Sequence, residues 1–307
     1  MTGVRNILIL GASGQVGIEL QRSFAGFGEI IAADRDRVDL SGPDQIRDAV
    51  RRTRPDVILN AAAYTAVDRA ESEPELAMAI NGHAPGILAE EAKRHDSILV
   101  HYSTDYVFDG TKEEPWTEAD PTHPLNVYGA SKLAGEEAIR QVAGRYLIFR
   151  TSWIYGPHGR NFLLTMLRLG RERDCLSVVD DQVGAPTSSI EIADATRAIL
   201  DGVFAGRFGS DADWSGLCHM TCSGSTSWYG FAQAIFERAA EFSSMRSPAL
   251  KPVPSSDYAT AARRPANSAL CNSLLRSRFD IQLAPWKAAL HVVMSALSNR
   301  DQTFQVS

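Results

Sequence analysis

The chain has 307 residues, enough for one large domain with a smaller lobe, and its 44% of apolar residues exclude a compositionally disordered protein. A formal net charge of -6 excludes nucleic acid as the main partner and leaves no basic patch for a membrane surface. With neither a secretory signal nor an apolar stretch long enough to span a bilayer, the sequence predicts a cytoplasmic protein.

The four cysteines are scattered along the chain, and no cysteine and histidine pair has the spacing of a zinc site. This arrangement fits a reducing compartment better than a disulfide framework. We therefore expect reduced, buried thiols at Cys175, Cys218, Cys222 and Cys271.

The first predicted element is a short apolar strand at residues 6–10 that leads directly into a glycine turn at residues 11–17. An amphipathic helix follows. Strand, glycine turn and helix together favour a dinucleotide site, because glycines let the backbone approach a pyrophosphate at the positive end of the helix. The spacing is GxxGxxG rather than the usual GxGxxG, and a tight turn without a ligand is the alternative.

The second predicted strand, residues 29–33, ends at Asp34, close to the distance expected for a residue that contacts the adenosine ribose. A carboxylate there favours the 2′-hydroxyl of NADH. Arg35 follows at once and suits the 2′-phosphate of NADPH. The sequence leaves both cofactors open.

Strands and helices continue to alternate as far as residue 150. Three consecutive strand–helix units imply an α/β fold with a Rossmann-type, doubly wound parallel sheet. The further predicted strands cover residues 57–63, 97–104 and 145–150, and the further predicted helices end at Arg54 or cover residues 75–95 and 128–141.

Polar and aromatic side chains follow the ends of these strands, where ligands bind in open α/β sheets. Ser103 and Thr104 end the fourth strand and are placed to bind a substrate carbonyl, or else cap a turn. Residues 109–124 are predicted to form a surface loop or a lid. Trp153 follows the fifth strand and is suited either to stacking on a sugar or base or to packing in the core.

Tyr128 and Lys132 stand four residues apart at the start of a predicted helix, so both side chains lie on one face. A cation near a phenol lowers the pKa of the phenol and makes it a suitable proton donor for an alkoxide–carbonyl exchange. A core tyrosine beside a solvated lysine is the alternative for this pair alone.

Beyond Asn161 the regular alternation ends, which predicts a smaller C-terminal lobe. We expect residues 1–155 to form the dinucleotide-binding domain, with segments of about 161–200 returning to it. Residues 156–307 form mainly a discontinuous substrate lobe by this prediction. Arg263 and Arg264 suit a diphosphate there, with solvated arginines as the alternative.

These motifs together resemble the dTDP-4-dehydrorhamnose reductase family of extended short-chain dehydrogenases/reductases. The resemblance runs almost end to end: GxxGQxG at 11–17, RPDVILNAAAYTAVDRAE at 54–71, STDYVFDG at 103–110, PLNVYGxSKLxGE at 124–136, RTSWIYG at 150–156, NF at 161–162, DQxGxPT at 181–187 and RRPxxS at 263–268. It implies hydride transfer from NADPH or NADH to C4 of dTDP-4-dehydro-β-L-rhamnose. The product, dTDP-L-rhamnose, supplies lipopolysaccharide or cell-wall polysaccharide.

The resemblance also implies roles for individual residues. Tyr128 donates the proton, Lys132 binds the nicotinamide ribose and lowers the pKa of Tyr128, and Thr104 holds the keto oxygen. The implied cofactor-binding residues are Gly11, Ser13, Gly14, Gln15, Val16, Gly17, Asp34, Arg35, Asp39, Leu40, Ala62, Ala63, Tyr64, Thr65, Tyr128 and Lys132. The implied substrate-binding residues are Thr104, Asp105, Tyr106, Trp153, Asn161 and Arg264.

Some members of this family hold Mg²⁺ through acidic side chains at a dimer interface. Glu19 matches one such position, but Ser188-Ser189-Ile190 follows Thr187 and the next acid is Glu191. The resemblance therefore predicts no metal site in this chain, and it leaves a homodimer open.

Two rival functions stay open on the resemblance. One is a nucleotide-binding regulatory subunit like that of methionine adenosyltransferase, which the full set of Thr104, Tyr128 and Lys132 disfavours. The other is a sugar-nucleotide epimerase or dehydratase. A dehydratase uses a pair of acids after the strand-four hydroxyl, whereas Tyr106 follows Asp105 here.

Overall fold

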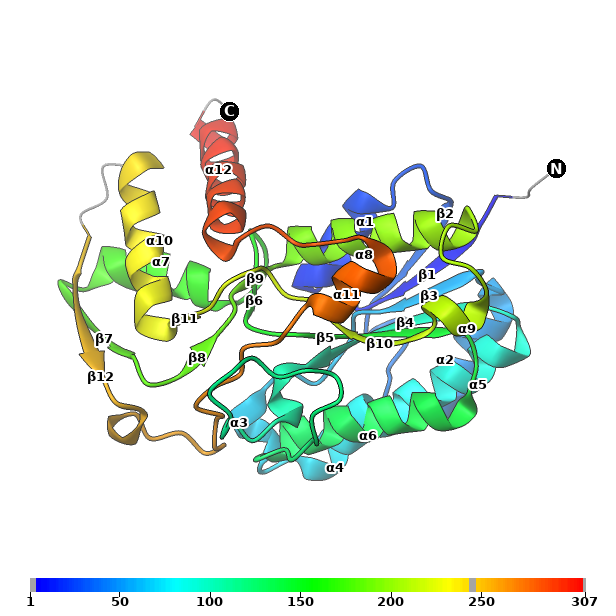
Figure 1. Cartoon of the computed structure of the whole chain (residues 1–307). Helices are drawn as coiled ribbons and strands as arrows, with labels where there is room; N and C mark the ends of the chain where they lie inside the picture. The colour runs from blue at the N-terminus through cyan, green and yellow to red at the C-terminus, as the bar shows by residue number, and fades with distance from the viewer. Residues whose placement is uncertain (1–3, 243–246, 306–307) are drawn as a thin grey trace.

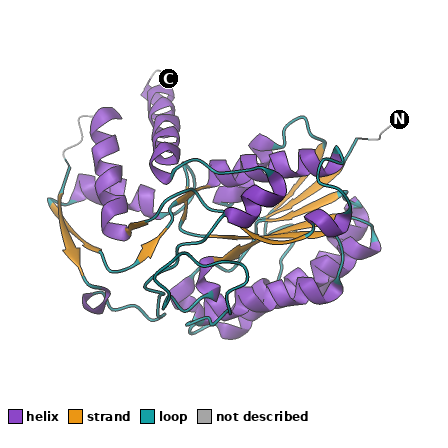
Figure 2. Cartoon of the chain, viewed as in Figure 1, coloured by secondary structure: helices purple, strands orange, loops and turns teal. Residues whose placement is uncertain are grey.

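The computed structural model describes residues 4–242 and 247–305, and a parallel sheet with helices on both faces forms its centre (Figures 1 and 2). The strands of this sheet are β1 Asn6–Leu10, β2 Glu29–Ala33, β3 Val57–Asn60, β4 Ile98–Thr104, β5 Tyr146–Thr151 and β10 Gly216–His219. They lie in the order β10-β5-β4-β3-β1-β2, and every neighbouring pair is parallel. The predicted Rossmann-type α/β fold is confirmed.

Helices cover the two faces of the sheet in separate layers (Figure 1). On one face, α1 Gln15–Ser23 packs against α8 Ser189–Phe204. On the other face, α5 Ala84–Arg94 lies between α2 Pro43–Thr53 and α6 Val127–Val142. Successive residues of a strand point to opposite faces of the sheet. Because helices cover both faces, the residues on either face must be apolar. In β1, Ile7 and Ile9 join the core under α1 and α8, whereas Leu8 and Leu10 join the core under α2.

The third strand is shorter than predicted. It ends at Asn60, and residues 61–63 form a loop instead of the end of a strand. The neighbouring strand β1 turns away at Gly11, and the bond from the N–H of Ala61 to the carbonyl of Leu10 is the last of this ladder. The loop is therefore free to line the end of the sheet.

The long predicted helix at residues 75–95 contains a π-helical turn. It consists of α4 Pro74–Met78, the π turn η1 Ala79–His83 and α5. Within this turn, the amide of Asn81 accepts from the N–H of Tyr64 at 2.8 Å and donates to Ser131 Oγ at 3.1 Å. Such turns are frequent at functional sites. Asn81 joins the loop after β3 to the helix α6.

The remaining elements lie mainly beside the central sheet (Figure 1). In this group β7 pairs with β12 in parallel, β8 pairs with β11 antiparallel, and α10 contacts both α7 and α12. Of the helices in the described part of the chain, none combines the length and apolar content that a membrane crossing requires. The bounds are α3 Val67–Ala70, η2 Asp105–Val107, β6 Ile154–Tyr155, α7 Phe162–Glu172, β7 Cys175–Val179, β8 Val183–Gly184, β9 Thr187–Ser188, α9 Asp211–Trp214, β11 Thr226–Ser227, α10 Trp228–Phe242, β12 Ala249–Val253, η3 Ser255–Asp257, α11 Ser273–Phe279 and α12 Trp286–Gln305.

The cysteines are free, as predicted, but they are not all buried. Cys218 and Cys222 are buried, whereas Cys271 is partly exposed and Cys175 is exposed. Cys175 begins β7, where alternate residues such as Leu176 point inward and leave Cys175 on the outer face. The prediction of a buried thiol is wrong at this position.

A buried ion pair fixes α6 on the sheet. Arg150 at the end of β5 donates to both carboxylate oxygens of Glu136 on α6, at 2.9 and 2.7 Å, and both side chains are less than 5% exposed. Ser103 Oγ donates to the same carboxylate. Removing one partner of such a pair strands the other charge away from water.

We expect Glu136→Gln to lower the free energy of unfolding by about 3–5 kcal/mol, because it leaves the Arg150 guanidinium buried without a counter-charge. Urea unfolding measures this loss. Glu172→Gln is the matched control, because Glu172 pairs with Arg168 on the surface of α7, and we expect it to cost less than about 1 kcal/mol. Equal losses in the two variants would contradict the role of the buried pair.

Candidate active site

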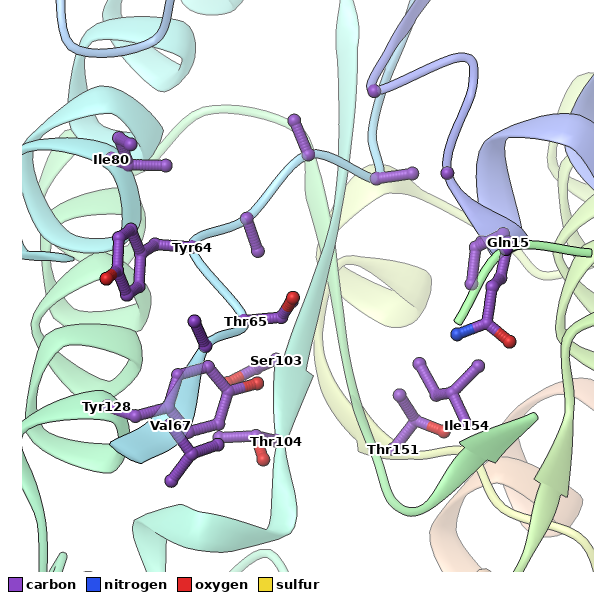
Figure 3. Close-up of a pocket in the computed structure, with 18 of the residues that line it drawn as sticks. Gln15, Tyr64, Thr65, Val67, Ile80, Ser103, Thr104, Tyr128, Thr151 and Ile154 are labelled. Atoms are coloured by element: carbon purple, nitrogen blue, oxygen red, sulfur yellow. The ribbon is translucent and has the colours of Figure 1, made fainter. Parts of the chain in front are cut away.

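A cavity of about 770 Å³ opens where β1, β3, β4 and β5 end (Figure 3). The sheet reverses its strand order on either side of β1, which is where open α/β sheets bind ligands. Most of the predicted cofactor residues line it: Gly11, Ser13, Gly14, Gln15, Val16, Asp34, Arg35, Asp39, Leu40, Ala62, Ala63, Tyr64 and Thr65.

The glycine turn has the close backbone contacts that a dinucleotide loop needs. Gly11 has φ of +74°, and a Cβ on it would lie 2.7 Å from the backbone of Ala62. Gly17 does not line the cavity. It packs under the turn, where a Cβ would lie 2.1 Å from the carbonyl oxygen of Gly11. No side chain caps the first turn of α1, so its N–H groups fit a pyrophosphate.

Two carboxylates and one cation, Asp34, Asp39 and Arg35, lie at the end of the cavity near β2. Asp34 Oδ1 accepts from the N–H of Ser13 at 2.7 Å, which fixes the carboxylate beside the glycine turn. Arg35 is 72% exposed and lies 3.5 Å from Asp39. Asp39 also receives the N–H of Ser41, and this hydrogen bond lowers the pKa of its carboxyl group. The structure thus offers a partner for a ribose hydroxyl and one for a phosphate.

The predicted catalytic hydroxyls share this cavity. Asn126 caps α6 by accepting from the N–H of Gly129 at 2.8 Å, and this places Tyr128 in the first turn of the helix. Thr104 ends β4, where its hydroxyl accepts from the N–H of Tyr106 at 3.2 Å. Figure 3 shows the hydroxyls of Tyr128 and Thr104 on the same wall of the cavity. Ser103 lies there too, but its hydroxyl is bonded to Glu136.

Burial sets the charge state of this wall. It raises the pKa of Tyr128 to about 12, while a hydrogen bond to Thr104 lowers that pKa and Asp105 raises it. Burial also raises the pKa of Asp105 to about 7. Asp105 is 2% exposed, and its Oδ2 has no hydrogen-bond partner within the described residues. The phenol of Tyr128 therefore carries its proton at neutral pH.

Lys132 lies elsewhere than predicted. Its Nζ donates to the carbonyl oxygen of Tyr102 at 2.6 Å and lies 3.2 Å from His101 Nε2, beneath the cavity rather than in its lining. Burial lowers its pKa to about 8, and Glu136 opposes this shift. Burial, Thr104 and Asp105 account for the pKa of Tyr128 in this structure, so the expected effect of Lys132 on that pKa stays a prediction. A buried ammonium group needs acceptors, and the strand β4 supplies them.

A stacked pair of tryptophans borders the cavity. Trp153 adopts a left-handed backbone with φ of +45°, and its ring lies on that of Trp228 with 3.5 Å between centroids. Trp228 lines both this cavity and a second one of about 1220 Å³. Gly184 makes room for the pair, because a Cβ there would lie 2.5 Å from the ring of Trp153. Trp228 is not among the site residues predicted from the sequence, because no motif near it in the chain indicates a ligand.

Of the other four predicted substrate residues, three line one of the two cavities and one lies outside both. Asp105 and Tyr106 line the first cavity, and Arg264 lines the second. Arg264 pairs with Asp68 at 2.8 Å, and both side chains line the second cavity. Asn161 lines neither. It caps α7 and donates to Gln15 Oε1 at 2.8 Å, so it positions a cavity residue.

Glu19, the position that matches a metal ligand of the resembled family, lies against two basic side chains. It is 3% exposed and pairs with Arg22 at 2.7 Å and with His158 at 3.4 Å. Within the described residues no group of three metal-binding side chains comes together.

Comparisons with known proteins match nearly the whole chain. A family model described as the RmlD substrate binding domain matches residues 5–299. A dTDP-4-dehydrorhamnose reductase of Burkholderia thailandensis is 49% identical over 290 residues, which cover 92% of this chain and 96% of that protein. The reductase of Escherichia coli K12 is 43% identical over 297 residues, covering 95% and 98%.

Solved structures give the same result. A dTDP-4-dehydrorhamnose reductase of Bacillus anthracis in complex with NADP has a TM-score of 0.87 and 34% identity, covering 96% of this chain and 100% of that one. A UDP-glucose 4-epimerase of Thermus thermophilus with NAD has a TM-score of 0.74 at 18% identity, covering 95% and 98%, and shares the fold alone.

We expect Arg35→Ala to weaken the binding of NADPH about tenfold and to leave that of NADH nearly unchanged, because Arg35 lines the cavity next to Asp34 and its cation suits a 2′-phosphate. Titration of each cofactor by its fluorescence gives the two affinities. Arg37→Ala is the matched control, since Arg37 is exposed on the same turn and outside the cavity lining. An equal loss for both cofactors would contradict this role of Arg35.

Proposed function

The chain belongs to the dTDP-4-dehydrorhamnose reductase family, and from that premise we propose that it reduces the C4 keto group of dTDP-4-dehydro-β-L-rhamnose to give dTDP-L-rhamnose. Bound NADPH or NADH supplies the hydride. The observation that carries the proposal is that the glycine turn, Thr104 and Tyr128 line the same cavity.

Tyr128 is the proton donor in this mechanism. Reduction of a ketone leaves negative charge on the C4 oxygen, which must receive a proton. The raised pKa of Tyr128, about 12, keeps its phenol protonated at neutral pH. Thr104 donates a hydrogen bond to the same oxygen and stabilises the charge as it develops. Its place in the cavity wall beside Tyr128 supports this role.

Lys132 supplies positive charge behind the phenol. Its pKa of about 8 keeps it mostly charged at neutral pH, one helical turn from Tyr128. This charge favours the phenolate that remains once the proton has left. By the family resemblance, Lys132 also binds the nicotinamide ribose of the cofactor.

The nucleotide part of the substrate occupies the second cavity in this proposal, and its sugar extends past Trp228, which lines both cavities, to Tyr128 in the first. Residues 156–307 form mainly the lobe around the nucleotide. Support comes from the cations Arg173, Arg263 and Arg264, which suit a diphosphate. Support also comes from Phe162 and Trp228, aromatic rings that suit a base or sugar. The dinucleotide domain then comprises residues 1–155 with later segments of about 161–200.

The reaction takes place in the cytoplasm by this proposal, and the four free cysteines support a reducing compartment. A homodimer remains a prediction for sedimentation analysis to test.

We expect Tyr128→Phe to lower kcat by about a hundredfold to ten-thousandfold, because it removes the proton donor and keeps the ring. The assay follows the oxidation of NADPH and of NADH with enzymatically generated dTDP-4-dehydro-β-L-rhamnose. Tyr146→Phe is the control, since Tyr146 starts β5 at the opposite edge of the sheet. Native turnover by Tyr128→Phe would contradict the assignment. If the protein without substitutions binds the cofactor tightly but shows no turnover, this would point to a regulatory subunit.

We expect the native rate to fall as pH rises past about 8, because Lys132 then loses its charge. Lys132→Met should lower both cofactor affinity and kcat, and its rate should no longer show this titration. Profiles of kcat against pH measure both effects, with Lys93→Met as the control at a surface lysine. Unchanged cofactor binding together with the native profile would remove Lys132 from the mechanism.

A further inference from the structure

His101 lies at the centre of a buried chain of polar groups beneath the cavity. It sits within β4, is 1% exposed, and connects Asn60 at the end of β3 with Lys132 on α6. Its Nε2 is 3.2 Å from Lys132 Nζ, and its Nδ1 is 3.0 Å from the side-chain amide of Asn60. None of the three side chains lines the cavity, so His101 acts on the reaction only through Lys132.

The contact with Lys132 determines where His101 carries its proton. An ammonium group only donates hydrogen bonds, so Nε2 must accept and the proton must sit on Nδ1. That N–H needs an acceptor, and the amide of Asn60 faces it. Asn60 Oδ1 has no partner within the described residues. A half-turn of the amide brings Oδ1 to the N–H, so Asn60 selects the tautomer.

The imidazole stays neutral in this place. Burial lowers the pKa of His101 well below its ordinary value, and the charge of Lys132 lowers it further. A charged imidazolium has no lone pair and would repel the ammonium group. The lone pair on Nε2 is therefore available to Lys132 throughout the neutral pH range.

We propose that His101 is a positioning residue of the reduction: its neutral Nε2 and the carbonyl oxygen of Tyr102 hold the ammonium group of Lys132 under the first turn of α6, while Asn60 fixes the tautomer of His101. This inference rests on the role proposed above for Lys132. A carboxylate at this position would pair with the ammonium group and cancel its charge, whereas a neutral acceptor holds it and leaves the charge available to the site.

Among the side chains around Lys132, His101 is the one that acts as a neutral hydrogen-bond acceptor. On α6, Glu136 lies one turn later and Tyr128 one turn earlier. Glu136 is already engaged by Arg150 of β5 and by Ser103 of β4. On the side of β3, the series of contacting polar side chains ends at Asn60, which carries no charge. Replacing His101 by an apolar side chain therefore removes a hydrogen-bond acceptor from Lys132 without changing any charge near it.

The test compares His101→Leu with His101→Gln. Leucine fills the space without an acceptor, whereas the amide oxygen of glutamine reaches the place of Nε2. We expect His101→Leu to lower kcat by about tenfold or more, the value of one hydrogen bond to a charged group. The fall in rate at alkaline pH should also move to lower pH, because the ammonium group loses an acceptor. His101→Gln should keep a rate within about threefold of native and the native pH profile.

His219→Leu is the matched control. His219 is a second fully buried histidine, on β10, where its Nδ1 lies 3.1 Å from the carbonyl oxygen of Trp116, so its ring contacts a backbone group rather than Lys132. Its loss should lower the melting temperature without moving the pH profile. Asn60→Ala provides a second route, since it frees the tautomer of His101 and should shift the profile in the direction of His101→Leu even where that variant fails to fold.

The outcomes separate this inference from the proposed function. A native pH profile in both His101→Leu and Asn60→Ala, or equal shifts in His101→Leu and His101→Gln, would overturn the positioning role. If Lys132→Met is impaired while those profiles stay native, only the role of His101 fails. If Lys132→Met itself is fully active, the proposed role of Lys132 fails first. A shifted profile in His101→Leu, rescued in His101→Gln, supports the proposal.

Discussion

The position of α6 depends on the buried polar seam between that helix and the sheet. Glu136 and Lys132 project from α6 into a region that excludes water, and each requires partners there. Arg150 on β5 supplies a counter-charge for Glu136, and β4 supplies the acceptors for Lys132. These contacts hold only in one placement of the helix. Tyr128, in the first turn of α6, is thereby held against the cavity.

The same seam explains why backbones approach so closely on this side of the sheet. A Cβ on Gly135 would lie 2.1 Å from the carbonyl oxygen of Asn81, and one on Gly129 would lie 2.2 Å from that of Tyr106. α6 therefore touches both the π turn and the turn η2 that follows β4. Since Asn81 also binds the backbone of Tyr64, the loop that follows β3 and the helix that carries Tyr128 share one support.

The central fold and the main cavity could be predicted from the sequence because their signals are local. Strands buried on both faces read as short apolar runs, and β1 and β2 begin and end where those runs do. The glycine turn, Thr104 and Tyr128 meet because all follow the same edge of a parallel sheet. The pairing of Asp68 with Arg264 and the stacking of Trp153 on Trp228 could not be predicted, since each joins residues far apart in the chain.

Lys132 shows where helical spacing stops being informative. The interval of four residues fixes the face of α6 on which its Cβ lies, but a long side chain can place its charge at many points from there. The tertiary structure decides among them, and the carbonyl oxygen of Tyr102 lies nearest. The tertiary structure thus gives a site with its protons in place for a reduction.

Tyr128, with a pKa of about 12, and Lys132, with a pKa of about 8, are both mainly protonated at neutral pH. A negative Asp105 also raises the pKa of Tyr128. The enzyme form that meets a ketone is therefore the one that can give it a proton, whereas oxidation of the alcohol requires the scarce phenolate.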